Sequence, residues 1–138
     1  MRYAASDSMI ASTGSYVYAV WSDSRNGSND IYFNVSSNSG LSWGVPKRID
    51  LGDNPGTNHS VQPRIACIGN YVYVMWLDFR TGTTQVFFNY STNNGTTWGN
   101  PSIQLCTGTG YNCQMPVRGG LECTGTFVYA CWVDDRTT

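Results

Sequence analysis

The chain has 138 residues, a formal net charge of −1 at pH 7 and only 12% charged residues. This balance excludes the basic surface of a nucleic-acid-binding protein, and no apolar stretch approaches the roughly 18 residues of a membrane-spanning helix. Aromatic residues make up 14% of the chain, and Gly, Ser, Thr and Asn are abundant. Such a composition favours short strands joined by tight turns over helices.

The first predicted elements form a unit of four strands over about residues 8–50. We expect these strands at residues 9–13, 16–22, 30–36 and 42–50. The second of them is apolar or aromatic on both faces, which is typical of a strand in a sheet covered on both sides. Gly14 stands at the first hairpin turn, where a positive φ angle is often required.

A second unit, over about residues 63–105, repeats the first. We expect its strands at residues 64–68, 71–77, 85–91 and 97–105. Trp76 follows Trp21 by 55 residues, and Trp98 follows Trp43 by the same 55 residues. Agreement at this many positions marks an internal structural repeat.

A third, partial unit over about residues 114–138 supplies strands at residues 116–123 and 127–133. It repeats a Gly, an aromatic residue, Val, Tyr, Trp, Asp and Arg at nearly fixed offsets, and Trp132 follows Trp76 by 56 residues. Four-stranded units repeated at this length are propeller blades. The sequence therefore predicts an all-β fold: about two and a half β-propeller blades of four antiparallel strands, forming one partial propeller over residues 1–138.

A Ser-x-Asn-x-Gly-x-Ser/Thr-Trp block occurs once in each complete unit, and we call the two copies the first and second Trp turns. Their defining residues are Ser36, Asn38, Gly40 and Trp43, and then Ser91, Asn93, Gly95 and Trp98. The Asn side chain can bond to backbone N–H groups of its own turn. Gly can take the left-handed conformation that closes the turn, and Trp can fold back as a hydrophobic plug. We therefore interpret these residues as structural.

These turns resemble the Asp box, or bacterial neuraminidase repeat, of sialidase-like β-propellers. The family usually has Asp where this chain has Asn38 and Asn93, and Asn keeps the acceptor oxygen. The resemblance implies that the turns lie on the face away from any active site. It also implies an extracellular or cell-surface protein, although this sequence shows no signal peptide. The propeller would be completed by further blades of the same longer chain or of identical copies in a homo-oligomer.

An Asp-x-Arg sequence follows the second strand of every unit, on the face where a propeller binds its ligands. The candidate ligand-binding residues are Asp23, Arg25, Asp78, Arg80, Asp134 and Arg136. In one interpretation the arginines ring the axis and hold an anionic sugar through forked hydrogen bonds. In the other, each Asp pairs with its Arg and locks the loop or bridges two units. Repetition in every unit favours the second interpretation. His59 is a further candidate in the polar loop between the first two units.

Asp30 breaks the repeat, because Gln85 occupies the corresponding position of the second unit. The resemblance implies that a carboxylic acid near such a loop acts as the general acid of a sialidase, so Asp30 is the catalytic candidate. A sialidase also needs three arginines and a Tyr paired with Glu. No arginine here has the family's Arg-Ile-Pro context, and the single Glu, Glu122, lies in a predicted strand.

The sequence therefore favours a non-catalytic glycan-binding or structural module with no cofactor and no metal. The alternative is a fragment of a sialidase-type glycoside hydrolase that is active only when the propeller is complete.

The chain contains five cysteines, an odd number that leaves at least one without an internal partner. Cys106 and Cys113 flank a Gly-rich loop and can form a disulfide in an oxidising compartment. All five can instead be small buried apolar residues. None of the spacings is typical of a zinc site.

Overall fold

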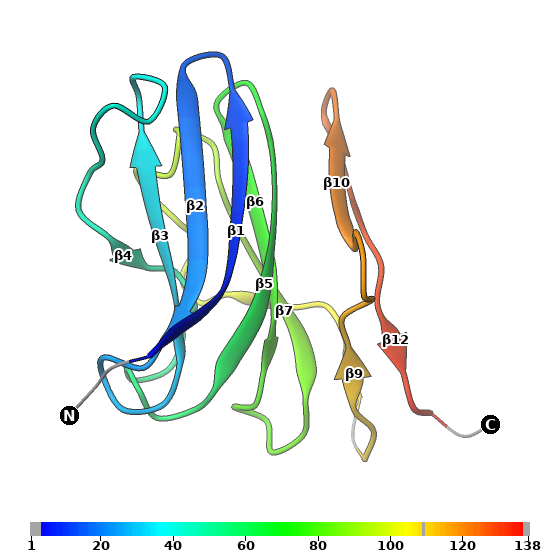
Figure 1. The fold of residues 1–138 in the computed structure, drawn as a ribbon. Helices are drawn as coiled ribbons and strands as arrows, with labels where there is room; N and C mark the ends of the chain where they lie inside the picture. Colours follow the sequence, from blue (N-terminus) through cyan, green and yellow to red (C-terminus); the bar gives the residue numbers. More distant parts are fainter. Residues whose placement is uncertain (1–3, 109, 137–138) are drawn as a thin grey trace.

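The computed structural model describes residues 4–108 and 110–136, which contain twelve β-strands and no helix. Figure 1 shows the longer strands running roughly parallel or antiparallel to one another. The predicted all-β fold is confirmed for these residues. No helix in them is long and apolar enough to cross a membrane.

The first two units each fold into a four-stranded antiparallel sheet with its strands in chain order. The first sheet contains β1 (Ala5–Thr13), β2 (Tyr16–Asp23), β3 (Asp30–Ser36) and β4 (Lys47–Arg48). The second sheet contains β5 (Ser60–Ile68), β6 (Tyr71–Asp78), β7 (Gln85–Ser91) and β8 (Ile103–Gln104). The predicted sheets of four antiparallel strands are therefore confirmed for both complete units.

The third unit forms two small antiparallel pairs, β10 with β11 and β9 with β12. Its strands are β9 (Cys113–Gln114), β10 (Leu121–Thr124), β11 (Phe127–Ala130) and β12 (Val133–Asp134). The pairing of Cys113 with Asp134 repeats the pairing of Ser60 with Asp78 in the second sheet. The third unit therefore keeps the register of the others.

A β-bulge interrupts the first strand of each sheet. Two residues, Asp7 and Ser8, stand opposite the single residue Trp21, and the pairing of β5 with β6 shifts in the same way at Gln62. Asp7 and Gln62 both have a φ of 54°, which is uncommon for residues other than glycine. In the third unit residues 115–120 separate β9 from β10, so the irregular segment is longer there.

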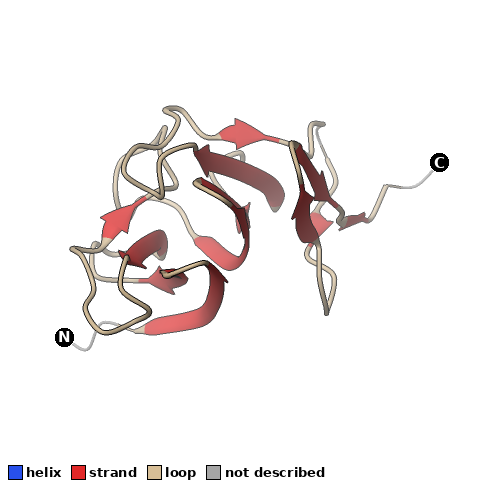
Figure 2. Cartoon of the chain, turned by 90° about the horizontal axis from the view of Figure 1, so that it is seen from above, coloured by secondary structure: helices blue, strands red, loops and turns tan. Residues whose placement is uncertain are grey.

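The second sheet is buried on both faces. One face carries Trp76 and Phe87 and packs against the first sheet, while the other carries Met75 and Phe88 and packs against the third unit. Trp76 and Met75 are fully buried. The first strands β1, β5 and β10 lie next to one another, so they form the adjoining edges of the three units. Figure 2 shows the units side by side from above.

The strands differ in extent from the sequence-based expectation. The fourth strands shrink from the predicted residues 42–50 and 97–105 to Lys47–Arg48 and Ile103–Gln104, because the Trp turns occupy the residues before them. The first strands start earlier, at Ala5 and Ser60, because the chain resumes pairing on the far side of each bulge. The predicted strand 116–123 shortens to Leu121–Thr124, and the predicted strand 127–133 is split into β11 and β12.

Candidate functional site

The two Trp turns have the same hydrogen bonds. In the first, the Oδ1 atom of Asn38 accepts from the Ser42 N–H at 2.9 Å and from the Ser36 hydroxyl at 2.9 Å. Ser36 Oγ in turn accepts from the Gly40 N–H at 2.9 Å. In the second turn the same bonds have lengths of 2.8–2.9 Å and are made by Ser91, Asn93, Gly95 and Thr97. Gly40 and Gly95 both have positive φ angles. The side chains of these turns are therefore occupied in ordering their own backbone.

The two tryptophans that end the turns differ in their surroundings. Trp98 packs edge-on against Phe33 of the first sheet, with ring centroids 4.9 Å apart. The Trp98 indole N–H donates to the Gly95 carbonyl oxygen at 3.1 Å. Trp43, the corresponding residue of the first turn, is 43% exposed. Trp98 therefore forms the expected hydrophobic plug by packing against the first sheet.

The Asp-x-Arg pairs lie at the other end of the sheets, where β2, β6 and β12 finish (Figure 1). In each pair the arginine binds its own aspartate. The carboxylate–guanidinium distances are 2.5 Å for Asp23–Arg25, 2.6 Å for Asp78–Arg80 and 2.5 Å for Asp134–Arg136. The guanidinium carbon also lies over an aromatic ring at 4.1 Å for Arg25, 4.5 Å for Arg80 and 4.9 Å for Arg136.

The hydrogen bond from Arg25 lowers the pKa of Asp23 to about 2, and Arg136 lowers the pKa of Asp134 in the same way. The charge of each of the three arginines is thus neutralised by the aspartate of its own unit. None of them offers an unpaired guanidinium to an anionic ligand.

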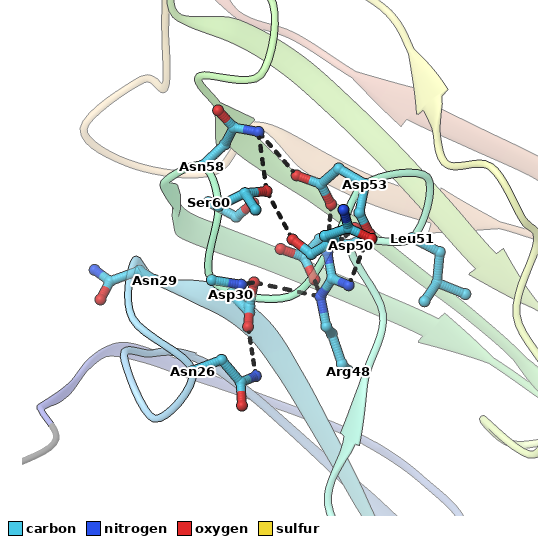
Figure 3. A network of polar contacts seen from close by, with 12 residues as sticks. Asn26, Asn29, Asp30, Arg48, Asp50, Leu51, Asp53, Asn58 and Ser60 are labelled. Atoms are coloured by element: carbon cyan, nitrogen blue, oxygen red, sulfur yellow. Dashed lines mark hydrogen bonds and ion pairs between the residues drawn. The ribbon is translucent and has the colours of Figure 1, made fainter.

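A buried polar network fills the loop between the first and second sheets (Figure 3). Arg48 Nε lies 2.8 Å from Asp50 Oδ1 and 3.3 Å from Asp30 Oδ1, and the Arg48 guanidinium also binds Asp53. Asp30 and Asp50 are each only 1% exposed. In the strand pairing, the second unit has Gln85, Gln104 and Cys106 at the positions of Asp30, Arg48 and Asp50. The network therefore breaks the symmetry of the repeat.

Asp50 is the least satisfied member of this network. Burial raises its pKa to about 6, an effect opposed by the nearby Arg48. Its Oδ2 atom has no hydrogen-bond partner among the described residues. The carboxyl group therefore takes up a proton at a higher pH than an exposed aspartate does.

Asp30, the catalytic candidate from the sequence, is enclosed by its neighbours. It accepts hydrogen bonds from the Asn26 amide at 2.7 Å and from the Gly56 N–H at 2.9 Å. Since it is also paired with Arg48, its oxygens are occupied in joining two loops. A general acid must reach the leaving group of a substrate, and this carboxylate has no such access.

His59 is exposed and lies edge-on to Phe79, with ring centroids 6.3 Å apart.

A pocket of about 360 Å³ lies where the three first strands meet, and we call it the bulge pocket. It is lined by the bulge residues of the first two units and by the longer segment of the third, with Asp7, Met9, Gln62, Arg64, Met115 and Pro116 among them. Both non-glycine bulge residues with positive φ, Asp7 and Gln62, take part. Strained backbone of this kind clusters at functional sites.

Arg64 is the cation of the bulge pocket. Its guanidinium donates to the backbone carbonyl oxygens of Pro63 at 3.1 Å and Pro116 at 3.3 Å. These bonds fix the side chain, and within the described chain Arg64 forms no ion pair with a carboxylate, although the exposed Asp7 lines the same pocket. The ion pairs of the described chain involve Arg25, Arg48, Arg80 and Arg136. A half-buried arginine without an ion-pair partner is suited to bind a carboxylate from outside.

Cys106 and Cys113 form a disulfide that joins the end of the second sheet to the start of the third unit. Cys67 and Cys123 are half-buried and Cys131 is exposed. Among the residues described, no group of three or more His, Cys, Asp or Glu side chains is arranged to hold a metal ion.

A search with this sequence found no matching protein-family model and no matching curated protein. The geometry of the sites is therefore what supports a function for the chain.

Proposed function

We propose that the chain is a segment of an extracellular Asp-box β-propeller that binds an acidic glycan without hydrolysing it. In this proposal each sheet is one blade, and the row of first strands β1, β5 and β10 faces the propeller axis. The support comes from the repeat, from the face-to-face packing of the units and from the common register of their strands. The Cys106–Cys113 disulfide supports an oxidising, extracellular location.

The outer face of the first sheet favours a further blade beside it. Trp21 and Tyr32 occupy the positions that Trp76 and Phe87 occupy in the second sheet. The latter two are 0% and 5% exposed because the first sheet covers them. Tyr32 is already only 8% exposed beneath Arg25, whereas Trp21 is only half-buried. A blade of the same longer chain, or of an identical copy, would cover Trp21 as the first sheet covers Trp76.

The observation that carries the binding proposal is the guanidinium of Arg64 in the bulge pocket, which forms no ion pair within the described chain. Acidic sugars combine one carboxylate with several hydroxyl donors. The carboxylate fits Arg64, while hydroxyl groups can donate to the exposed carboxylate of Asp7 across the same pocket. The apolar surface of Met9 and Met115 is available to the ring carbons. The pocket has the size of an ordinary small-molecule site.

The carboxylates favour binding over hydrolysis. Glycoside hydrolysis normally uses two carboxyl groups on either side of the scissile bond. Asp7 is the carboxylate that lines the bulge pocket, and Asp30 is enclosed in the network around Arg48. The proposed module therefore recognises its ligand and leaves the glycosidic bond intact.

An array of acidic and neutral glycans, probed with the native protein, tests the proposal. We expect binding to carboxylate-bearing glycans that falls at least tenfold in Arg64→Ala. Arg25→Ala removes an arginine already neutralised by Asp23 and serves as the matched control, which should bind normally. Equal melting temperatures would exclude unfolding as the cause. Failure to bind any acidic glycan, or equal losses in both variants, would contradict the proposal. Turnover of a fluorogenic sialoside would favour the hydrolase alternative instead.

A further inference from the structure

A second hollow, of about 410 Å³, lies between the two Trp turns, at the opposite end of the sheets from the Asp-x-Arg loops. We call it the inter-turn crevice. The first unit supplies Tyr16, Ser42 and Trp43, and the second unit supplies Asn93, Asn94 and Thr96. We propose that this crevice binds a short neutral oligosaccharide. The proposal does not depend on the bulge pocket or on any ligand bound there.

The walls of the crevice are fixed before any ligand arrives. The Tyr18 hydroxyl of the first sheet donates to Asn94 Oδ1 of the second Trp turn at 2.8 Å. Lys47 Nζ, also of the first sheet, donates to the Thr96 carbonyl oxygen at 2.8 Å. These two bonds cross the boundary between the two units that form the crevice. A site held in its binding geometry loses little conformational freedom on binding.

Aromatic surface is available at the mouth of the crevice. Trp43 is 43% exposed, and its indole N–H has no hydrogen-bond partner among the described residues. Trp98, by contrast, has both its ring and its N–H engaged. Tyr16 stacks on Tyr18 at a centroid distance of 6.1 Å, which holds its ring in place. An exposed Trp offers an apolar face for ring C–H groups and one donor at its edge.

The polar groups that line the crevice are neutral. The hydroxyl of Ser42 accepts from Asn38 Nδ2 at 2.9 Å and so keeps its own proton free to donate. Asn94 uses its carbonyl oxygen for Tyr18 and keeps its amide N–H groups. Thr96 adds a second hydroxyl. Amides and hydroxyls beside an aromatic ring match the alternating C–H and O–H surface of a sugar, and none of the residues that line the crevice is charged.

Titration of the native protein with neutral oligosaccharides, namely cello-, manno- and galacto-oligosaccharides, tests this inference. Binding is followed by calorimetry and by the change in tryptophan fluorescence. We expect saturable binding of at least one series, at least a tenfold weaker affinity in Trp43→Ala, and partial recovery in Trp43→Phe. Leu41→Ala changes an apolar residue of the same turn that is 87% exposed and does not line the crevice, so it should bind normally.

Three results would overturn the inference: no binding of any series at millimolar concentration, undiminished binding in Trp43→Ala, or preferential binding of uncharged peptides. Arg64→Ala separates this inference from the function proposed above, because it should weaken binding of acidic glycans at least tenfold and leave binding of neutral oligosaccharides unchanged. Loss of both activities in Arg64→Ala would contradict the existence of two independent sites.

Discussion

Arg80 of the second unit donates a hydrogen bond to the backbone carbonyl oxygen of Asp50 in the first unit, at 3.1 Å. The same guanidinium donates to the Leu51 carbonyl oxygen at 3.1 Å and forms an ion pair with Asp78 at 2.6 Å. Arg80 therefore locks its own loop and bridges two adjacent sheets. Arg25 performs only the first of these tasks in the described chain, since it binds Asp23 and no carbonyl of another unit.

Replacement of Arg80 by Ala should therefore destabilise the fold much more than the same change at Arg25. Asp78 is fully buried, and loss of its partner leaves a buried charge at a cost of about 3 kcal/mol. The Arg25 side chain is 40% exposed, so its ion pair contributes about 1 kcal/mol or less. Urea denaturation of both variants measures the difference. Equal losses in the two variants would contradict the bridging role of Arg80.

Stability should fall as the pH rises through about 6, because of Asp50. Its pKa is raised by burial from the ordinary 3.8 to about 6, so the folded state holds the proton more tightly than the unfolded state. The contribution is fully present below pH 3.8 and is lost above pH 6, which amounts to roughly 3 kcal/mol for a shift of this size. Asp23, with its pKa lowered to about 2, acts in the opposite direction only at lower pH.

Denaturant titrations between pH 4.5 and pH 7.5 check this dependence. Asp50→Asn removes the titrating group while its Oδ1 atom can still accept from Arg48, so the variant should lose most of the pH dependence. An unchanged pH profile in Asp50→Asn would show that another group is responsible.

Gly95→Ala should cost more stability than Gly40→Ala, although the two glycines occupy the same position of their turns. Both have positive φ, +78° at Gly95 and +86° at Gly40, so both substitutions carry the left-handed penalty of about 1 kcal/mol. A Cβ atom at Gly95 would lie 2.2 Å from Phe33 Cε1, whereas one at Gly40 meets nothing within 4 Å. Overpacking adds about 1–3 kcal/mol at Gly95 alone. Thermal unfolding measures the difference, and a larger loss at Gly40 would contradict the packing.

Asn93→Ala should lower the free energy of unfolding by about 1–3 kcal/mol, because two donors lose their acceptor. These donors are the Ser91 hydroxyl and the Thr97 N–H. Asn93→Asp keeps both acceptor positions and should be nearly as stable as the native chain. Hydrogen–deuterium exchange of the second Trp turn reports the change locally. Equal destabilisation by Asp and Ala would show that the Nδ2 bond to Thr97 matters more than the acceptor oxygen.

The sequence predicts the sheets better than their ends. The 55-residue spacing of Trp21 and Trp76 places the second strands correctly, because buried aromatic positions repeat with the fold. The bulges were not predicted, since Asp7 and Gln62 interrupt the alternation and the predicted strands begin after them, at residues 9 and 64. The fourth strands are shorter than predicted because the Trp turns occupy the residues before them.

The candidate sites were predicted less completely. The Asp-x-Arg loops could be read from the repeat, but the bulge pocket depends on three strands distant in sequence, and Arg64 was not singled out among the arginines. The network of Arg48, Asp50 and Asp53 was missed as well. Its signal was the replacement of Arg48 and Asp50 by Gln104 and Cys106 in the second unit, which has one extra residue before its fourth strand. Comparison of the units position by position, beyond the shared motif, would have revealed it.

An experimental structure of the native particle, in whatever assembly it forms in solution, is the most direct test of the propeller proposal. We expect the outer face of the first sheet to be covered by another four-stranded antiparallel sheet, with Trp21 as buried as Trp76. A particle in which the Trp21 face remains in solvent, or is covered by an element other than a β-sheet, would contradict it.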